Sequence, residues 1–389
     1  MSTFIKLIFQ CNSLNSDSRI MISMKILVIN TVPTEKNGIT NVIFNYLEAI
    51  NHQNIQMDIL MINDADQSYK DRACEYGGKP VVIQRSMKGI FSYFLGLIDA
   101  IKRERYDAVH IHGNSHTMAI ELLAAKLAGC KIRITHSHNT TCSSVVLHKL
   151  LSPLFYSLYT NGLACGKDAG YWQYGQRPFT VINNGVDTSL FAFDSAARSA
   201  IREHLGLDES KILIGNVGHF WGEVKNQTFA VKVFYELFQK NRNYRLCLIG
   251  DGSFRESVMK QVEDLGLSEF VYFTGNINNV NEYLNGIDFI LMPSLYEGLP
   301  LTLVEQQANG LQCICSDAIT RESDKTANLL FISLDKSSSE WAKEIESFVS
   351  LTCRDERSKK AVEDIKIAGY SIQEEAKKLE KYYNNAISQ

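Results

Sequence analysis

The chain has 389 residues and a formal net charge of −3, with 45% hydrophobic and 21% charged residues. At about 150 residues per domain, this length indicates two or three globular domains of ordinary composition. The charge argues against nucleic-acid binding, which is typical of strongly basic proteins. No stretch reaches the roughly 18–20 uninterrupted apolar residues that span a membrane.

Residues 1–23 precede the first predicted strand, and we interpret them as an N-terminal extension. Their apolar core, residues 4–9, is short, and no small-residue cleavage pattern follows it, so the segment is a poor secretory signal. The nine cysteines are scattered and form no Cys-x-x-Cys pair. This pattern favours reduced thiols and a cytoplasmic protein.

The first half of the chain alternates short β-rich segments with longer helical ones. Strands are predicted at 25–29, 57–62, 81–83, 108–111, 132–135, 162–164 and 180–182. Helices are predicted at 39–51, 90–104, 117–128 and 145–160. Strands separated by helices indicate βαβ units and a parallel sheet.

The same pattern starts again at residue 211, where Lys-Ile-Leu-Ile-Gly is similar to the opening strand at residue 25. Strands are then predicted at 244–249, 270–273, 287–292 and 312–316. Helices are predicted at 254–265, 279–285, 301–309 and 371–387. Two doubly wound α/β units are therefore expected, with ligands at the carboxyl ends of their strands and in a cleft between them. No Gly-x-Gly-x-x-Gly follows either opening strand, so a redox dinucleotide site is not supported.

The strongest motif is Pro-Ser-Leu-Tyr-Glu-Gly-Leu-Pro-Leu-Thr-Leu-Val-Glu at residues 293–305. A strand leads into a Gly/Pro loop, and a helix is expected to begin near Leu301. The free N–H groups of such a helix start bind anions. Glu305, one turn inside the helix, is suited to accept hydrogen bonds from a diol such as ribose. The alternative is an ordinary helix entry with acidic residues near its N-terminus.

This segment resembles the Glu-x7-Glu signature of the retaining GT-B glycosyltransferases of family 4, in which Glu297 and Glu305 are the two glutamates. Four other segments resemble family motifs in the same order along the chain, at residues 107–112, 182–187, 248–252 and 273–275. The resemblance covers about residues 24–385. The sequences of these motifs are most similar to those of enzymes of capsule and exopolysaccharide synthesis.

The resemblance implies an α/β protein with the GT-B fold, in which two Rossmann-like domains face a central cleft. Residues 24–185 would form the acceptor domain and residues 186–370 the nucleotide-sugar domain. Residues 371–389 would form a helix that packs back across the junction. The implied reaction transfers a sugar, from a UDP-hexose or UDP-N-acetylhexosamine, to a hydroxyl of a growing lipid-linked saccharide with retention of configuration. No metal, other cofactor or nucleic acid is expected.

The family's Gly-Arg-x5-Lys loop, which holds the donor diphosphate, is matched by residues 218–226. Lys225 is retained, but His219 replaces the arginine. A histidine is charged only if its pKa is raised, as an adjacent diphosphate would do. The alternative is a purely structural His219. Gly38 matches the second glycine of the family's Gly-Gly loop, where the backbone approaches the ligand, and Asn37 replaces the first.

By the same resemblance, the donor site includes Gly298 and the N–H groups of Leu301 and Thr302, which hold the leaving diphosphate together with Lys225. Glu305 would bind the ribose. Glu297 would contact a donor-sugar hydroxyl or the developing positive charge.

Histidines cluster after two strands of the first unit. His138 is expected to line the anomeric centre, in preference to His136, with both on a turn. His112 and His136 are assigned to the acceptor side of the cleft. Zinc binding by such His-x-His pairs is the competing interpretation. It is set aside because no Cys or Glu partner has the required spacing. The Asp-x-Asp at residues 64–66 is interpreted as a solvated loop.

Charge is unevenly distributed, at +5 over residues 1–180 and −8 over the remainder. The basic part contains apolar helical stretches flanked by charge near residues 88–103 and 147–155. They are candidates for peripheral contact with an anionic membrane. The alternative is core helices with solvated ends. Two other functions stay open: a sugar-nucleotide epimerase or hydrolase of the same fold, and a non-catalytic subunit that binds a sugar nucleotide.

Overall fold

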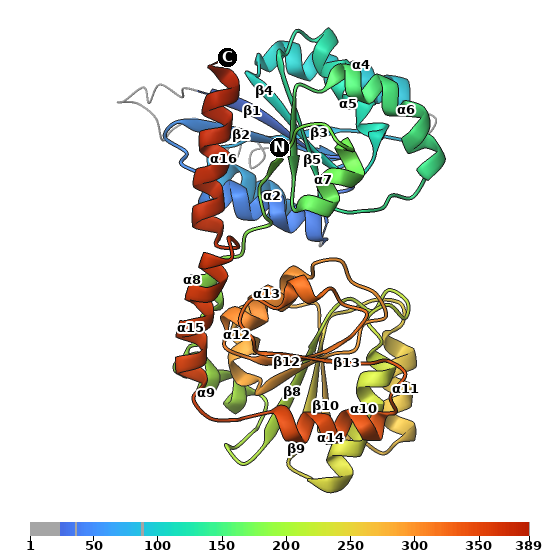
Figure 1. The fold of residues 1–389 in the computed structure, drawn as a ribbon, viewed down its shortest axis with the longest axis vertical. Coiled ribbons are helices and arrows are strands. Elements are labelled where there is room, and N and C mark those ends of the chain that lie inside the picture. Colours follow the sequence, from blue (N-terminus) through green and yellow to red (C-terminus); the bar gives the residue numbers. More distant parts are fainter. Residues whose placement is uncertain (1–23, 36, 87–88, 389) are drawn as a thin grey trace, which may run out of the picture. The chain divides into compact units, whose positions relative to one another are not determined.

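The computed structural model describes residues 24–35, 37–86 and 89–388, and the predicted N-terminal extension lies outside them. The chain divides into two compact units (Figure 1). One is Asn184–Glu375, and the other combines the chain up to Asn183 with Ala376–Gln389. The terminal helix α16 (Ile372–Ile387) therefore begins in the second unit and continues in the first.

The first unit is built on a parallel sheet in the order β3-β2-β1-β4-β5-β6-β7. Its strands are β1 (Met24–Asn30), β2 (Ile55–Ile62), β3 (Pro80–Ile83), β4 (Ala108–Gly113), β5 (Ile132–Ser137), β6 (Asn161–Ala164) and β7 (Thr180–Val181). Strands β1, β2 and β3 are mainly apolar with little alternation, as expected where both faces of a parallel sheet are covered, whereas β4 and β5 alternate apolar residues with histidines and other polar residues.

Helices cover both faces of this sheet. The helices are α2 (Gly38–Ala49), α3 (Gln67–Glu75), α4 (Ile90–Glu104), α5 (Ala119–Leu127), α6 (Val145–Leu158) and α7 (Lys167–Tyr174), with a 3-10 turn, η1 (His116–Met118). Helices α4, α5, α6 and α7 pack against one face of the sheet, and the core between them contains Leu27, Ile111, Leu97 and Phe155. On the other face, Tyr383 of α16 reaches His110 of β4.

The second unit repeats the design with a parallel sheet in the order β10-β9-β8-β11-β12-β13. Its strands are β8 (Ile212–Val217), β9 (Tyr244–Ile249), β10 (Val271–Gly275), β11 (Phe289–Met292), β12 (Gln312–Ser316) and β13 (Leu329–Ile332). Its helices are α8 (Thr188–Phe191), α9 (Ser195–His204), α10 (Gln227–Lys240), α11 (Arg255–Asp264), α12 (Val280–Gly286), α13 (Leu301–Ala308), α14 (Ser338–Phe348) and α15 (Arg354–Ile367), with 3-10 turns η2 (Ser268–Phe270) and η3 (Arg321–Ser323).

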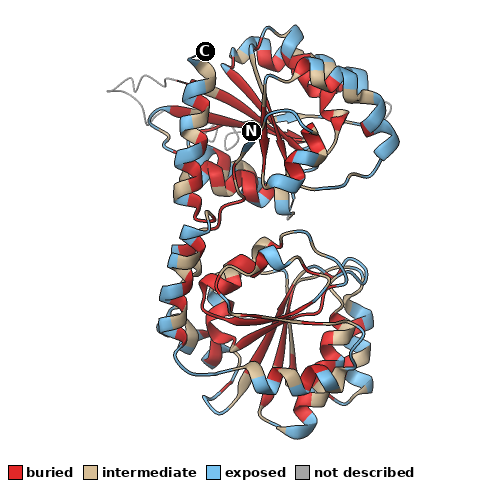
Figure 2. Ribbon diagram, viewed as in Figure 1, coloured by how far each residue is buried: buried red, intermediate tan, exposed pale blue. Residues whose placement is uncertain are grey.

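Two cores flank this second sheet. The core against α10, α11 and α14 includes Phe234 and Trp341, and the core against α12 and α13 includes Leu303 and Cys313. Figure 2 shows the strands of each sheet as buried and the outer sides of the helices as exposed. Within the described residues, no helix combines the length and the apolar character needed to cross a membrane.

The predicted pair of parallel α/β units is confirmed, but several elements escaped prediction. They are α3, α7, α8, α9, β13, α14 and α15. Apolar periodicity is weak in α7 and α15, and the sequence of α15 is largely charged. The start of α14 carried a local signal, because Ser337 and Glu340 form a capping box.

Candidate active site

The loop between β8 and α10 folds against the loop that follows β9. The Gly218 N–H donates to the Ile249 carbonyl at 2.9 Å, and the Phe220 N–H donates to the Asp251 carbonyl at 2.9 Å. A Cβ atom on Gly250, whose φ is +138°, would lie 2.1 Å from the Gly218 carbonyl oxygen. Only glycine permits this approach of two backbones, and it fixes the path of the loop that carries His219.

The same loop is joined to the one that follows β11, the neighbouring strand. The Leu295 N–H donates to the Val224 carbonyl at 2.8 Å, and Asn226 Nδ2 donates to the Pro293 carbonyl at 3.0 Å. Asn226 adopts a left-handed conformation with a φ of +52°. These bonds bring two predicted motifs, 72 residues apart at Lys225 and Glu297, to one edge of the sheet.

Lys225 and Glu297 form an ion pair, with Nζ 2.6 Å from Oε1. Both side chains are largely buried, at 14% and 15% exposure. The alkyl chain of Lys225 lies over Gly218, where a Cβ atom would be 3.0 Å from Lys225 Cδ. Sequence reasoning assigned these residues to different parts of a donor molecule. In the structure they also neutralise each other.

His219 lies in this loop beside the ion pair. Its carbonyl accepts from Gln227 Nε2 at 3.1 Å, and its Nδ1 accepts from the Trp221 N–H at 3.4 Å. Burial, followed by the charge of Lys225, lowers the pKa of His219, and Glu297 opposes this shift. The imidazole is therefore neutral at pH 7 in the ligand-free protein, unlike the arginine of the family motif.

Helix α13 begins at Leu301, as predicted, directly after Pro300. Proline supplies no side-chain cap, and no acidic residue lies in the first turn. The amides of Leu301 and Thr302 have no carbonyl one turn earlier to which they could donate, so they are available to an anion. A Cβ atom on Gly298, three residues before this helix start, would meet no atom within 4 Å, so there is open space beside Gly298.

Glu305 lies one turn into α13 and is half-buried. Burial raises the pKa of its carboxyl group to about 7. Within the described parts of the chain, its side chain makes no hydrogen bond and no ion pair. A carboxyl group that loses water without gaining a partner is destabilised in its charged form, and hydroxyl donors from a ligand would relieve this cost.

In the first unit, the predicted histidines lie on adjacent strands. His112 of β4 pairs in register with His136 of β5, and both rings are buried, at 3% and 0% exposure. The expectation that His136 lies on a turn is wrong, because β5 continues to Ser137. His138 follows the strand, is half-buried, and its Nε2 lies 2.8 Å from His112 Nδ1. Of these three residues, His138 is the one positioned to meet a ligand directly.

Gly38 is the first residue of α2, and the substituted position before it has a structural role. Asn37 is the N-cap of the helix, and its side chain accepts from the Thr40 N–H at 2.9 Å. A Cβ atom on Gly38 would meet nothing within 4 Å, so the backbone of this turn is accessible. Asparagine is among the strongest N-cap residues, which accounts for its presence in place of glycine.

Two contributions to the site were missed from the sequence. The roles of Gly250 and Asn226 in joining the three loops depend on backbone conformation, although the Gly-Asp-Gly at residues 250–252 signalled a special turn. The ion pair of Lys225 with Glu297 had no signal in the spacing, because it follows from the adjacency of β8 and β11.

Solved structures also contain two such units. Anabaena Alr3699/HepE, solved in complex with UDP and glucose, matches 93% of this chain and 100% of its own with a TM-score of 0.73 and 16% identity. At that identity the likeness establishes the fold alone. The fold is GT-B, as the motif resemblance predicts.

Two family models divide the chain between them. The family described as Glycosyltransferase Family 4 matches residues 36–190, and Glycosyl transferases group 1 matches residues 197–366. The putative glycosyltransferase EpsF of Bacillus subtilis (strain 168) is 31% identical over 324 residues, which cover 80% of this chain and 84% of EpsF. The chain therefore belongs to the glycosyltransferase family that these two models describe.

A second relative adds a named reaction. The UDP-Gal:alpha-D-GlcNAc-diphosphoundecaprenol alpha-1,3-galactosyltransferase of Escherichia coli is 29% identical over 248 residues, covering 60% of this chain and 62% of the relative.

Proposed function

We propose that this glycosyltransferase moves a hexose or N-acetylhexosamine from its UDP derivative to a hydroxyl of a lipid-linked saccharide, with retention of anomeric configuration. The observation that carries the proposal is the edge of the second sheet, where the ion pair of Lys225 with Glu297 lies on loops that lead into α13, an uncapped helix that carries Glu305 one turn from its start. The UDP complex of Alr3699/HepE and the UDP-Gal-dependent relative of Escherichia coli support UDP as the nucleotide.

The helix start of α13 and Lys225 would bind the donor diphosphate. Cleavage of the glycosidic bond builds negative charge on this leaving group, and preorganised donors at that position stabilise the transition state. The donors are Lys225 Nζ and the N–H groups of Leu301 and Thr302, with a further contribution from His219 if bound diphosphate protonates it. With these groups in place, the proposed reaction requires no metal at the diphosphate.

The ion pair of Lys225 with Glu297 would be exchanged for a pair of Lys225 with the diphosphate when the donor binds. A bound diphosphate competes with Glu297 for the ammonium group, which is 2.6 Å from the carboxylate in the ligand-free protein. Glu297 released in this way would accept a hydrogen bond from a donor-sugar hydroxyl or face the positive charge that develops on the sugar. Glu305, without a protein partner, would accept both ribose hydroxyls.

His138 would line the anomeric centre, and the backbone at Gly38 would approach the sugars. No side chain is assigned as the base. In a front-face reaction, the departing phosphate oxygen accepts the proton of the acceptor hydroxyl, so the new bond forms on the side from which the old one breaks. Retention follows from that geometry.

The lipid-linked acceptor calls for a membrane surface, which α6 and α4 offer. Their exposed apolar side chains are Phe91 and Leu95 of α4, and Val145, Val146, Leu147, Leu150 and Leu154 of α6. Lys102, Arg103 and Lys149 lie on the same helices, within the net-positive part of the chain. We propose that these exposed apolar side chains rest on the inner face of the cell membrane. Flotation with anionic vesicles tests it, and the idea fails if Val146→Ser/Leu150→Ser floats like wild type.

Product analysis tests the central proposal. The purified protein is incubated with a panel of UDP- and GDP-sugars and undecaprenyl-diphosphate-linked acceptors, without added metal and with Glu305→Gln in parallel. A new glycoside that Glu305→Gln forms at least about tenfold more slowly supports the proposal. An epimerised or hydrolysed sugar nucleotide without glycoside would indicate the alternative enzyme, and nucleotide binding without any turnover would indicate a binding subunit.

A further inference from the structure

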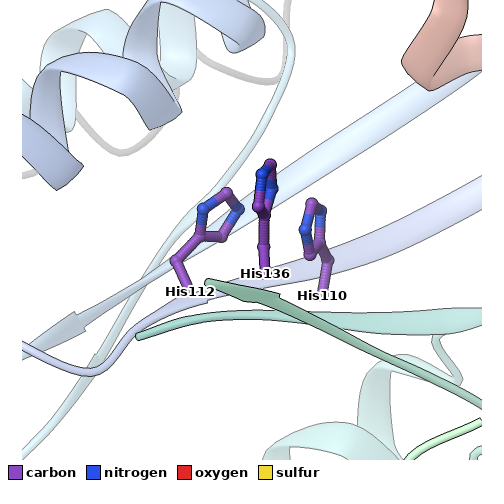
Figure 3. A group of neighbouring side chains, drawn as sticks. All are labelled: His110, His112 and His136. Carbon is purple, nitrogen blue, oxygen red and sulfur yellow. The ribbon is translucent and has the colours of Figure 1, made fainter. Parts of the chain in front are cut away.

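Four histidines lie on one face of the first sheet. Side chains of a strand alternate between faces, so His110 and His112 of β4 point the same way. The register of β4 with β5 places His136 beside His112, and His138 follows on the same side. Figure 3 shows the rings of His110, His112 and His136 gathered above these two strands.

Three of these rings form a compact cluster. One ring nitrogen from each of His110, His112 and His136 lies within 4.8 Å of the others. Tetrahedral zinc with Zn–N bonds of about 2.0–2.1 Å separates its nitrogen ligands by roughly 3.3 Å. The side chains would have to rotate so that these separations shorten by roughly 1.5 Å to bind one ion.

The cluster contains buried nitrogens with no partner. Considering the described residues, His110 Nε2 lacks a hydrogen bond, and the backbone of Ile182 can engage only one of the two ring nitrogens of His136, although both residues are 0% exposed. Buried polar atoms are nearly always paired, because an unpaired one retains its full desolvation cost. A cation bound by these nitrogens would remove that cost.

Two ring nitrogens of these residues already have partners outside the group of three. His110 Nδ1 lies 2.6 Å from the hydroxyl of Tyr383, and His112 Nδ1 lies 2.8 Å from His138 Nε2. Metal-binding histidines nearly always engage their second nitrogen in this way, which sets the tautomer and directs the free nitrogen at the ion. Here, two of three rings have that outer support before any ion is present.

We propose that His110, His112 and His136 bind one divalent transition-metal cation of the zinc type through three imidazole nitrogens. Three neutral nitrogens without a carboxylate suit Zn²⁺, Co²⁺, Ni²⁺ or Cu²⁺ and do not suit Mg²⁺ or Ca²⁺. Water would occupy the fourth position. His138, half-buried and stacked on His136 with ring centroids 4.4 Å apart, marks the side nearest to solvent.

This site is distinct from the donor diphosphate site, which lies in the other unit and in which the proposed chemistry uses no metal. Its effect would be local. An ion at the cluster would join β4 to β5 and fix the tautomer of His112, and through it the position of His138. The sequence argument against zinc considered ligand spacing along the chain, whereas the third ligand comes from the neighbouring strand.

Metal binding is tested directly on the full chain, purified without a polyhistidine tag and dialysed against a chelator. Co²⁺ is added and visible spectra are recorded, and bound Zn²⁺ is counted by elemental analysis after dialysis. We expect one equivalent of metal and the intense d–d bands of tetrahedral cobalt. We also expect a Tm higher by roughly 5 °C at a zinc concentration of about 100 times Kd.

Two variants locate the ion. His136→Gln should lose the cobalt bands and the zinc-dependent rise in Tm. His148→Gln is the matched control, because His148 is a buried histidine that stacks on His116, outside the cluster. His110→Gln replaces His136→Gln if circular dichroism shows the latter to be unfolded. Absence of tetrahedral bands in the wild-type protein, or their retention in a folded cluster variant, overturns the proposal. Neither result depends on the glycosyltransferase assay.

Discussion

The two units carry their polar residues in opposite ways on the same kind of sheet. In the second unit, Lys225, Glu297 and Glu305 lie on loops and a helix start beyond the strands. In the first unit, His110 and its neighbours lie within the strands and are fully buried. Loops at a sheet edge tolerate charge because a ligand or water reaches them, whereas a covered face accepts a polar group only in neutral form or paired with an opposite charge.

The direction of the pKa shifts follows this difference. Burial, reinforced by neighbouring imidazoles, lowers the pKa values of His110, His112 and His136 well below the ordinary value. Burial alone raises the pKa of Glu305 to about 7, which leaves it ionisable at physiological pH. Glu305 in the second unit can therefore carry a charge that interacts with a ligand, whereas the buried histidine rings of the first unit are neutral.

The largest expected effect is at the ion pair. Lys225→Ala should lower kcat/KM for the UDP-sugar at least about tenfold, or ~1.4 kcal/mol of transition-state stabilisation, because the diphosphate loses its cation. It also leaves Glu297 largely buried without a partner. Steady-state kinetics measure the loss, with Lys232→Ala on the exposed side of α10 as the control. Equal activity of the two variants would remove Lys225 from the donor site.

Glu305→Gln should also lower activity at least about tenfold and change the pH dependence of donor binding. With a pKa of about 7, wild-type Glu305 gains its charge between pH 6 and pH 8. The charged form accepts ribose hydroxyls, so UDP affinity should rise up to about tenfold over this interval. Calorimetric titration at both pH values measures it. If the UDP affinity of Glu305→Gln rose as much between pH 6 and pH 8, the pH dependence would come from ionisation of UDP itself and not from Glu305.

The stability of the ligand-free protein should respond to Glu305 in the opposite direction. A folded-state pKa of about 7, above the ordinary 4.5, favours the protonated form. The stability it contributes is complete below pH 4.5 and is lost as the pH rises through 7. Glu305→Gln, neutral throughout, should therefore exceed the wild-type Tm at pH 8 by roughly 2 °C and match it near pH 4.5. Thermal unfolding without nucleotide measures this difference, and an unchanged gap between the two pH values would contradict it.

A substitution in the first unit should separate turnover from donor affinity. His138→Ala should reduce kcat several-fold, because His138 would line the anomeric centre, and leave the Kd for UDP unchanged within about twofold, because no group that holds the diphosphate is altered. Kinetics and titration on the same preparation measure both. If UDP binding weakened as much as kcat, the division of labour between the units would be wrong.

The smallest expected effect is on UDP affinity at His219, the residue that replaces the arginine of the family motif. His219 is neutral at pH 8, since burial and Lys225 lower its pKa. His219→Arg restores a permanent charge and should tighten UDP binding by about threefold at pH 8. The gain should shrink at pH 6, where bound diphosphate protonates the histidine. A gain that is equal at both pH values would show that His219 does not titrate in the complex.

Prediction from the sequence was best where the signal was local. The strand, loop and helix around residues 293–305 occur as predicted, with α13 beginning at Leu301. It was weakest where elements depend on tertiary packing, as for the charged helix α15, whose buried Ile365 packs against Val304 of α13. The turn assigned to His136 failed because β5 continues two residues beyond the predicted end, paired with β4 and β6.

The sequence by itself determined the two parallel α/β units and the family, and it predicted the residues around the donor, because the individual elements and motifs on which these inferences depend are local in the sequence. The tertiary structure alone decided which of these residues meet. Parallel strands place residues far apart in the chain side by side at one edge or on one face, as with Lys225 and Glu297, or His112 and His136. Spacing along the chain does not encode that adjacency, so partners, burial and the resulting pKa shifts emerge only from the folded sheet.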